Sequence, residues 1–137
     1  MIDHLGLNVA DLVRSTEFYL KALAPLGYAI VLEIPGEQTG QNAALGFGVP
    51  GGSPEDFQSG KPSFWIGEGD RVSGPSHVAF VARTRAAVDA FHRAALAAGG
   101  KDNGTPGLRP HYHANYYGAF VLDPDGNNIE AVCHAPS

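Results

Sequence analysis

Hydrophobic and polar positions follow the same order twice along this chain. Residues 2–10 and 76–82 combine β-branched and large apolar side chains over the length of a strand. Asp11 and Thr84 follow these strands as helix N-caps, and apolar residues then recur at helical spacing. Later strands are predicted at 28–34, 42–49, 62–67, 117–122 and 127–134, with 108–113 as a short strand or a loop. The pattern therefore predicts an α+β fold of two consecutive βαβββ modules.

The two halves of this pattern are also similar residue by residue. Residues 4–27 align with residues 77–100 at a constant offset of 73 without a gap. The alignment pairs identical residue types at His4/His77, Phe18/Phe91 and Gly27/Gly100. Such internal similarity predicts that one structural unit is present twice, and it places two histidines at equivalent positions.

Length and composition indicate that the two modules share one core. A chain of 137 residues buries about two thirds of its unfolded surface, which suffices for one core but hardly for two. Hydrophobic content of 44% and charged content of 17% are those of an ordinary globular protein. We therefore expect a single domain over residues 1–137, with module one at about 1–68 and module two at about 74–135.

Charge and hydropathy narrow the classes of partner. The formal net charge of −5 and the lack of a basic stripe argue against a nucleic-acid partner. No apolar run reaches the roughly 18 residues that cross a bilayer, so no membrane partner is expected. The N-terminal residues lack the features of a signal peptide. A cytoplasmic location and a small-molecule substrate are the resulting expectations.

Three residues form the main chemical hypothesis. Strand alternation places His4 and His77 on faces that also carry small residues, which suits a cavity. Glu130 lies in the middle of the last strand between apolar neighbours, and a buried carboxylate needs a cation or a metal. Two imidazoles and one carboxylate can hold one divalent ion, whether Fe, Mn, Zn, Ni or Co, and leave positions open for substrate. The alternatives are hydrogen-bonded structural histidines and a salt-bridged or solvated glutamate.

Polar aromatic residues gather in the segment 109–117, just before a predicted strand. His113 and Tyr116 are candidate acid/base or orienting groups, because both can donate and accept protons. Arg109 and His111 are candidate contacts to an anionic substrate. A solvated loop or a subunit contact is the alternative interpretation of the whole segment.

The remaining histidines and the single cysteine are interpreted as structural. His92 aligns with a helical position of the first module and is expected on the helix surface, and His134 is expected in solvent near the end of the chain. As the single cysteine, Cys133 excludes an internal disulfide, and we interpret it as a small core residue because it faces away from Glu130. A role as nucleophile is not expected, since no histidine is predicted beside it.

The motifs together resemble the vicinal oxygen chelate superfamily over nearly the whole chain. They are His4-Leu5-Gly6-Leu7-Asn8-Val9 with Asp11, Ser15, Phe18 and Tyr19, then Ser76-His77-Val78-Ala79-Phe80, and the run from Phe120 through Asp123-Pro124-Asp125-Gly126 to Glu130. The resemblance implies paired βαβββ modules that curl into an open, mostly antiparallel barrel-like sheet with helices outside. It also implies a homodimer and a metal held by the first and last strands of each module, where His4, His77 and Glu130 match.

Two positions depart from the glyoxalase pattern within that superfamily. Trp65 falls where glyoxalases carry a fourth metal ligand, and Asn8 falls where they carry an arginine that binds glutathione. Lactoylglutathione lyase is therefore not the expected activity, although Trp65 and Asn8 can contact a substrate. The expectation is a divalent-metal-dependent lyase, isomerase or dioxygenase whose metal acts as a Lewis acid on a small oxygen-rich substrate. The alternatives are a metal-free, bleomycin-resistance-like binding protein and an inactive regulatory module.

Overall fold

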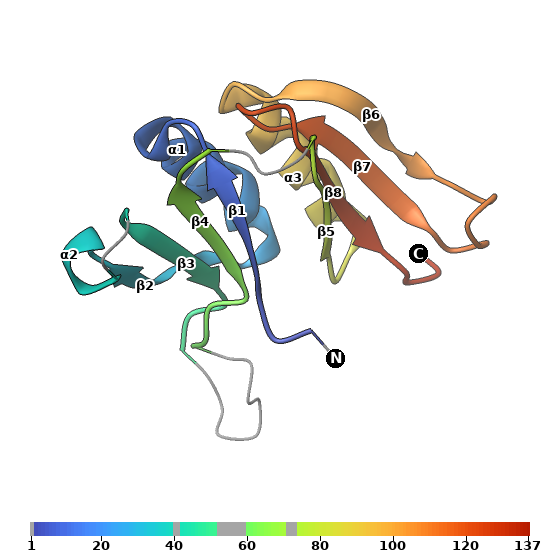
Figure 1. Ribbon diagram of the computed structural model, residues 1–137. Helices are drawn as coiled ribbons and strands as arrows, with labels where there is room; N and C mark the ends of the chain where they lie inside the picture. Colours follow the sequence, from blue (N-terminus) through green and yellow to red (C-terminus); the bar gives the residue numbers. More distant parts are fainter. Residues whose placement is uncertain (1, 40–41, 52–59, 71–73) are drawn as a thin grey trace.

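The computed structural model describes residues 2–39, 42–51, 60–70 and 74–137 (Figure 1). The first half contains β1 (Leu5–Val9), α1 (Leu12–Leu23), the short helix η1 (Ala24–Leu26), β2 (Ala29–Ile34), α2 (Gly36–Thr39), β3 (Ala44–Gly48) and β4 (Phe64–Glu68). The second half contains β5 (His77–Val81), α3 (Arg85–Ala97), β6 (Lys101–Leu108), β7 (Tyr117–Leu122) and β8 (Asn128–Cys133). The expected boundary between the modules includes residues 71–73, which lie outside the described residues.

Each half folds into one four-stranded mixed sheet. The strand orders are β1-β4-β3-β2 and β5-β8-β7-β6. In each sheet the first and last strands of the module pair in parallel, and the other pairs are antiparallel. The sheets do not close into a barrel, and the predicted α+β fold of paired βαβββ modules is confirmed.

Asp11 and Thr84 cap the starts of α1 and α3, as the sequence predicts. The Asp11 side chain accepts a hydrogen bond from the Arg14 backbone N–H at 3.0 Å, and the Thr84 side chain accepts one from Ala87 at 3.1 Å. Gly27 follows η1 with φ of 84°, a left-handed conformation that glycine adopts without strain. The chain can therefore turn sharply from the helices into β2.

Helix α1 covers one side of the first sheet, and α3 covers one side of the second. Helix α1 packs against α3, and the core joins residues from both modules in one cluster. No helix of the described residues lies over the opposite faces, and Ala79 and Val81 of β5 are exposed there. Among the described residues, no helix is both long and apolar enough to cross a membrane.

A turn of the second module joins the first module through buried polar contacts. The Asp123 carboxylate is 5% exposed and accepts hydrogen bonds from the Tyr19 hydroxyl at 2.5 Å and from the Asn127 backbone N–H at 2.8 Å. The Asp125 carboxylate accepts one from the Ala10 backbone N–H at 3.1 Å. The Asp-Pro-Asp-Gly motif is therefore a turn that also links the modules.

Two expectations from the sequence are wrong. Strand β6 spans Lys101–Leu108 instead of beginning at residue 108, and register shifts at its glycines interrupt its pairing with β7. His92 is not on the surface, since it is 7% exposed and its Nε2 lies 2.9 Å from Asp102 Oδ1 on β6. Cys133 is buried at 1% exposure, as expected of a core residue.

Candidate functional site

A histidine and a buried glutamate meet on the open face of the second sheet. His77 begins β5 and Glu130 lies on the adjacent β8, where its Cα is paired with Ala79. His77 Nε2 lies 3.2 Å from Glu130 Oε2. The Glu130 side chain is only 2% exposed, whereas that of His77 is 51% exposed. The carboxylate is therefore buried beneath an imidazole that solvent can reach.

The second carboxylate oxygen has a different partner. The Tyr116 hydroxyl donates a short hydrogen bond to Glu130 Oε1. Burial, followed by this bond and the charge of Glu130, raises the pKa of Tyr116 well above its ordinary value. Gly118 leaves room for the pair, since a Cβ at this position would lie 3.1 Å from Oε1 and 3.2 Å from Tyr116 Cε1. Tyr116 therefore stays protonated and holds one oxygen of the carboxylate.

The hydrogen-bond partners of His77 determine what its other nitrogen can do. His77 Nδ1 lies 3.0 Å from the Asn128 carbonyl oxygen, which can only accept, so Nδ1 carries a proton. The Nε2 lone pair of neutral His77 then faces a carboxylate oxygen, and a cation must lie between these two acceptors. A proton on Nε2 satisfies this condition. A divalent ion held by this nitrogen and this oxygen would satisfy it too, because imidazole and carboxylate are both common metal ligands.

His4 lies apart from His77 and Glu130 in the folded chain. Its Nδ1 contacts Asp3 Oδ1 at 2.6 Å, and its side chain is 57% exposed. The preceding residues Ile2 and Asp3 line a hollow together with residues 78–81 of β5, and β1 begins at the end of the molecule where β5 ends (Figure 1). The ends of this five-residue strand are about 13 Å apart, and β1 and β5 run in opposite directions (Figure 1). Within the described residues of one chain, no three His, Cys, Asp or Glu side chains form a metal-binding group.

Trp65 occupies in the first sheet the position that Glu130 occupies in the second. Its Cα is paired with Gly6 of β1, as Glu130 is paired with Ala79 of β5. A hollow of about 570 Å³ on this face is lined by Trp65, Gly6 and Asn8 among others. Asn8 donates a hydrogen bond to the Asp70 carbonyl at 2.9 Å. The first module therefore presents an indole where the second presents a carboxylate.

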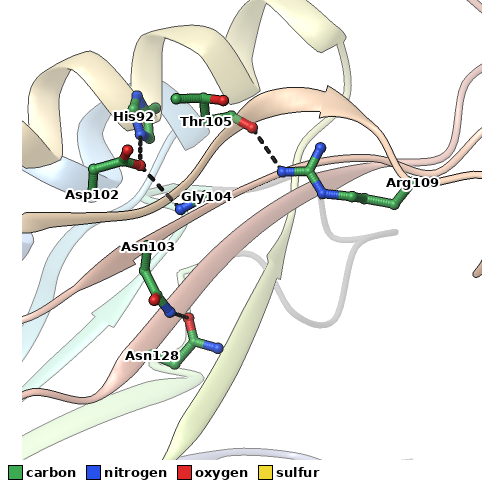
Figure 2. Close-up of polar contacts among 7 residues, drawn as sticks. All are labelled: His92, Asp102, Asn103, Gly104, Thr105, Arg109 and Asn128. Atoms are coloured by element: carbon green, nitrogen blue, oxygen red, sulfur yellow. Dashed lines mark hydrogen bonds and ion pairs between the residues drawn. The ribbon is translucent and has the colours of Figure 1, made fainter.

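Strand β6 brings Arg109 to the same face as His77. The Arg109 guanidinium lies 5.6 Å from the centre of the Phe120 ring, and His77 stacks on that ring at 6.3 Å. Figure 2 shows how the strand is held, with Arg109 Nη2 donating to the Thr105 carbonyl at 2.7 Å. The guanidinium, the phenyl ring and the imidazole thus form one continuous surface.

The same strand also fixes the residue that orients His77. Asn103 Nδ2 donates to Asn128 Oδ1 at 3.1 Å (Figure 2), and the Asn128 backbone carbonyl receives the proton of His77 Nδ1. Asp102 accepts hydrogen bonds from His92 and from the Gly104 backbone N–H, and the bond to His92 is the larger cause that lowers the pKa of Asp102. These contacts hold β6 on α3 and β8.

The remaining candidate residues lie at the end of the second sheet. His113 Nε2 lies 2.7 Å from His134 Nδ1, and both rings contact the edge or face of Tyr116. His111 contacts Tyr112, with ring centres 4.3 Å apart. His134 was expected in solvent, and although its side chain is exposed it belongs to this cluster. The sequence signal for this position is the alternation of side chains along the last strand, which places His134 on the same face as Glu130.

The family profile and the similar solved structures point to the same superfamily. The profile described as Glyoxalase/Bleomycin resistance protein/Dioxygenase superfamily matches residues 1–131. No curated protein sequence matches the chain. Among solved structures, a glyoxalase/bleomycin resistance protein from Albidiferax ferrireducens T118 is similar with a TM-score of 0.70 and 28% identity, over 95% of both chains.

Two more distant structures show the same fold. A glyoxalase I mutant from Zea mays has a TM-score of 0.65 and 24% identity, and the match covers 96% of this chain and 46% of that one. The fosfomycin resistance protein FosX from Listeria monocytogenes, whose crystal structure is a mutant complexed with Mn(II) and 1S,2S-dihydroxypropylphosphonic acid, has a TM-score of 0.64 and 18% identity. That match covers 96% of this chain and 88% of the other.

Proposed function

Because the chain belongs to the Glyoxalase/Bleomycin resistance protein/Dioxygenase superfamily, we propose that it is a divalent-metal-dependent enzyme acting on a small, oxygen-rich substrate. The observation that carries this proposal is the contact between His77 and Glu130. Two acceptor atoms 3.2 Å apart, one of them on a 2% exposed carboxylate, need a cation between them. The N/O donor set fits Fe, Mn, Zn, Ni or Co as that cation.

A second copy of the chain would complete the site. His77 and Glu130 provide two ligands, whereas His4 of the same chain precedes β1, which begins at the opposite end of the molecule from β5 (Figure 1). Both sheets leave one face without a helix, with Val81 exposed to 70%. In a homodimer that places the open face of one module against the open face of the other, His4 of a second copy provides the third ligand. The substrate then binds between the two modules.

Such a metal would act as a Lewis acid toward neighbouring substrate oxygens. The chain's own residues would orient the substrate and manage protons around it. Glu130 keeps Oε2 directed at His77, while Tyr116 holds a proton at Oε1. Arg109 offers N–H donors to an anionic group, and Phe120 provides an apolar surface beside it. Trp65 and Asn8 of the second copy would form the opposite wall. The substrate class is therefore a small anion with adjacent oxygens.

Calorimetry with divalent ions tests this proposal. Protein stripped with a chelator is titrated separately with Mn(II), Ni(II) and Zn(II), and we expect one ion per chain. His77→Ala should abolish binding, because it removes one of two ligands in contact. His111→Ala is the matched control, since His111 is exposed and its ring contact is to Tyr112. The proposal is wrong if no ion binds, or if both variants bind as the wild type does.

Ligand binding without chemistry is a second candidate function. The observation that favours it is Trp65 beside the hollow of about 570 Å³, where the indole offers an apolar wall. A metal-free sequestering protein would bind an organic ligand equally well with and without divalent ions. It would also be indifferent to His77→Ala and sensitive to Trp65→Ala, which separates it from the metalloenzyme.

A further inference from the structure

Two histidines that are distant in the sequence, His113 and His134, contact each other beside the candidate site. His113 lies in the loop before β7, and His134 follows the last residue of β8. Their rings stack at an interplanar angle of 24° with centres 4.9 Å apart. The nitrogens Nε2 of His113 and Nδ1 of His134 face each other at 2.7 Å. This distance is that of a hydrogen bond.

The direction of this bond follows from a neighbouring backbone group. The Asn115 backbone N–H donates to His113 Nδ1 at 3.1 Å, so Nδ1 carries no proton. The proton of neutral His113 is therefore on Nε2 and is donated to His134 Nδ1. A metal on His113 Nε2 would require the proton on Nδ1, where it would oppose the Asn115 N–H. The pair is consequently a hydrogen-bonded pair of neutral imidazoles.

The two imidazoles enclose the tyrosine that binds Glu130. The His113 and His134 rings contact the Tyr116 ring at 5.5 Å and 5.4 Å, with interplanar angles of 75° and 83°. Tyr112 packs on Tyr116 at 4.8 Å. Because the phenol ring is held on several sides, its hydroxyl is directed at Glu130 Oε1.

The backbone beyond His134 is also held in place. Arg85, the first residue of α3, donates from Nη2 to the Pro136 carbonyl at 2.8 Å and to the Ala135 carbonyl at 3.4 Å. Its guanidinium lies 5.3 Å from the centre of the Tyr117 ring. The end of the chain is thus attached to the helix, and this attachment presents His134 to His113.

We propose that the hydrogen bond from His113 to His134 is a latch that positions Tyr116 on Glu130. With the latch closed, Tyr116 occupies Oε1, and Oε2 alone is presented beside His77. His113 and His134 are therefore positioning residues that act through Tyr116. The effect on metal binding rests on the proposed function, whereas the latch itself is a property of the metal-free protein.

Proton NMR of the metal-free protein tests the latch directly. The Tyr116 hydroxyl proton, held between a ring and a carboxylate, is expected as a slowly exchanging downfield signal that Tyr116→Phe removes. His134→Ala, which deletes the acceptor, should broaden it beyond detection. His134→Asn should keep the hydroxyl signal, since the amide oxygen of the introduced asparagine lies near the position of His134 Nδ1 and can accept the same hydrogen bond. A signal missing from the wild type, or unchanged in His134→Ala, overturns the proposal. His113→Ala removes the donor and should reproduce the loss in a second variant.

Mn(II) affinity separates this proposal from the proposed function. Residues that orient metal ligands change affinity by roughly 10–100-fold, so His134→Ala should weaken Mn(II) binding at least about tenfold, with His134→Asn close to the wild type. Equal affinities in these two variants, with wild-type binding intact, overturn the positioning role. A wild type that binds no Mn(II) contradicts the proposed function instead, and the hydroxyl signal then decides the latch alone.

Discussion

Replacing Tyr116 with phenylalanine isolates the hydrogen bond that satisfies the buried carboxylate. The ring remains and keeps its contacts with His113 and His134, while the donor to Glu130 Oε1 disappears. Glu130 is 2% exposed, so water cannot easily replace the lost donor. The expected consequence is a lower free energy of unfolding in the metal-free protein.

The expected loss in the free energy of unfolding follows from the kind of hydrogen bond that Tyr116 makes to Glu130. A hydrogen bond to a charged group contributes about 1.5–3 kcal/mol, and a buried acceptor left without a donor costs a similar amount. For a chain of this length, each kcal/mol lowers Tm by about 3–5 °C. Tyr116→Phe should therefore lower the free energy of unfolding by about 1.5–3 kcal/mol.

The pH dependence of this difference provides a second criterion. The folded-state pKa of Tyr116 is raised, chiefly by burial and then by Glu130, so the folded protein retains the proton more strongly than the unfolded chain. This contribution is fully present below the unfolded tyrosine pKa of about 10 and is lost as the pH rises above it. The difference between wild type and variant should be constant near neutral pH and narrow above about pH 10.

Urea denaturation followed by circular dichroism measures both quantities. Tyr28→Phe is the matched control, because the Tyr28 hydroxyl makes a neutral contact of 3.3 Å with Ser63 Oγ and should contribute about 0.5–1.5 kcal/mol. If Tyr116→Phe costs no more than Tyr28→Phe, the reasoning about the buried carboxylate is refuted.

Three further substitutions test other parts of the structure. Gly118→Ala places a methyl group 3.1 Å from Glu130 Oε1 and should weaken Mn(II) binding by roughly tenfold, which calorimetry would detect; unchanged affinity would mean that the carboxylate is not confined there. Asp102→Asn removes a carboxylate whose pKa is lowered mainly by His92. The stability it contributes is present above the ordinary aspartate pKa of about 3.9 and lost as the pH falls through the lower folded-state value, so the variant should unfold with less dependence on acid pH, and an identical pH profile would contradict this. Tyr19→Phe deletes the donor to a buried carboxylate of the turn between β7 and β8 and should lower the free energy of unfolding by about 1.5–3 kcal/mol in urea, whereas a loss near zero would show that this bond does not link the modules.

Local patterns in the sequence predict most of the fold because local physics determines it. Helix caps at Asp11 and Thr84 and alternation along β1, β5 and β8 can be recognised without tertiary information. Strand β6 could not be predicted in the same way, because glycines and a proline interrupt its pattern and its pairing with β7 depends on bulges. The burial of His92 follows from β6, since its partner Asp102 lies there.

The candidate site was predictable only in part, for a geometric reason. A carboxylate in the middle of an apolar strand requires a partner, and His77 and Tyr116 are near Glu130 as that argument requires. The internal repeat makes His4 and His77 equivalent, but equivalence is not proximity. Because β1 and β5 run in opposite directions, the starts of the two strands lie apart. The contact of His113 with His134 depends on the path of a loop, which side-chain periodicity does not encode.

Mixing two variants that are each expected to lose metal binding tests most directly whether a metal centre forms between two copies. His4→Ala and His77→Ala are each expected to lose stoichiometric Mn(II) binding as homodimers. In a mixed dimer, intact His4 from one copy meets intact His77 and Glu130 from the other, which restores one of the two sites. Random exchange of subunits makes half of the dimers mixed, so the mixture should recover roughly a quarter of the wild-type Mn(II) content. A mixture that binds no more Mn(II) than either variant alone would contradict the shared metal centre.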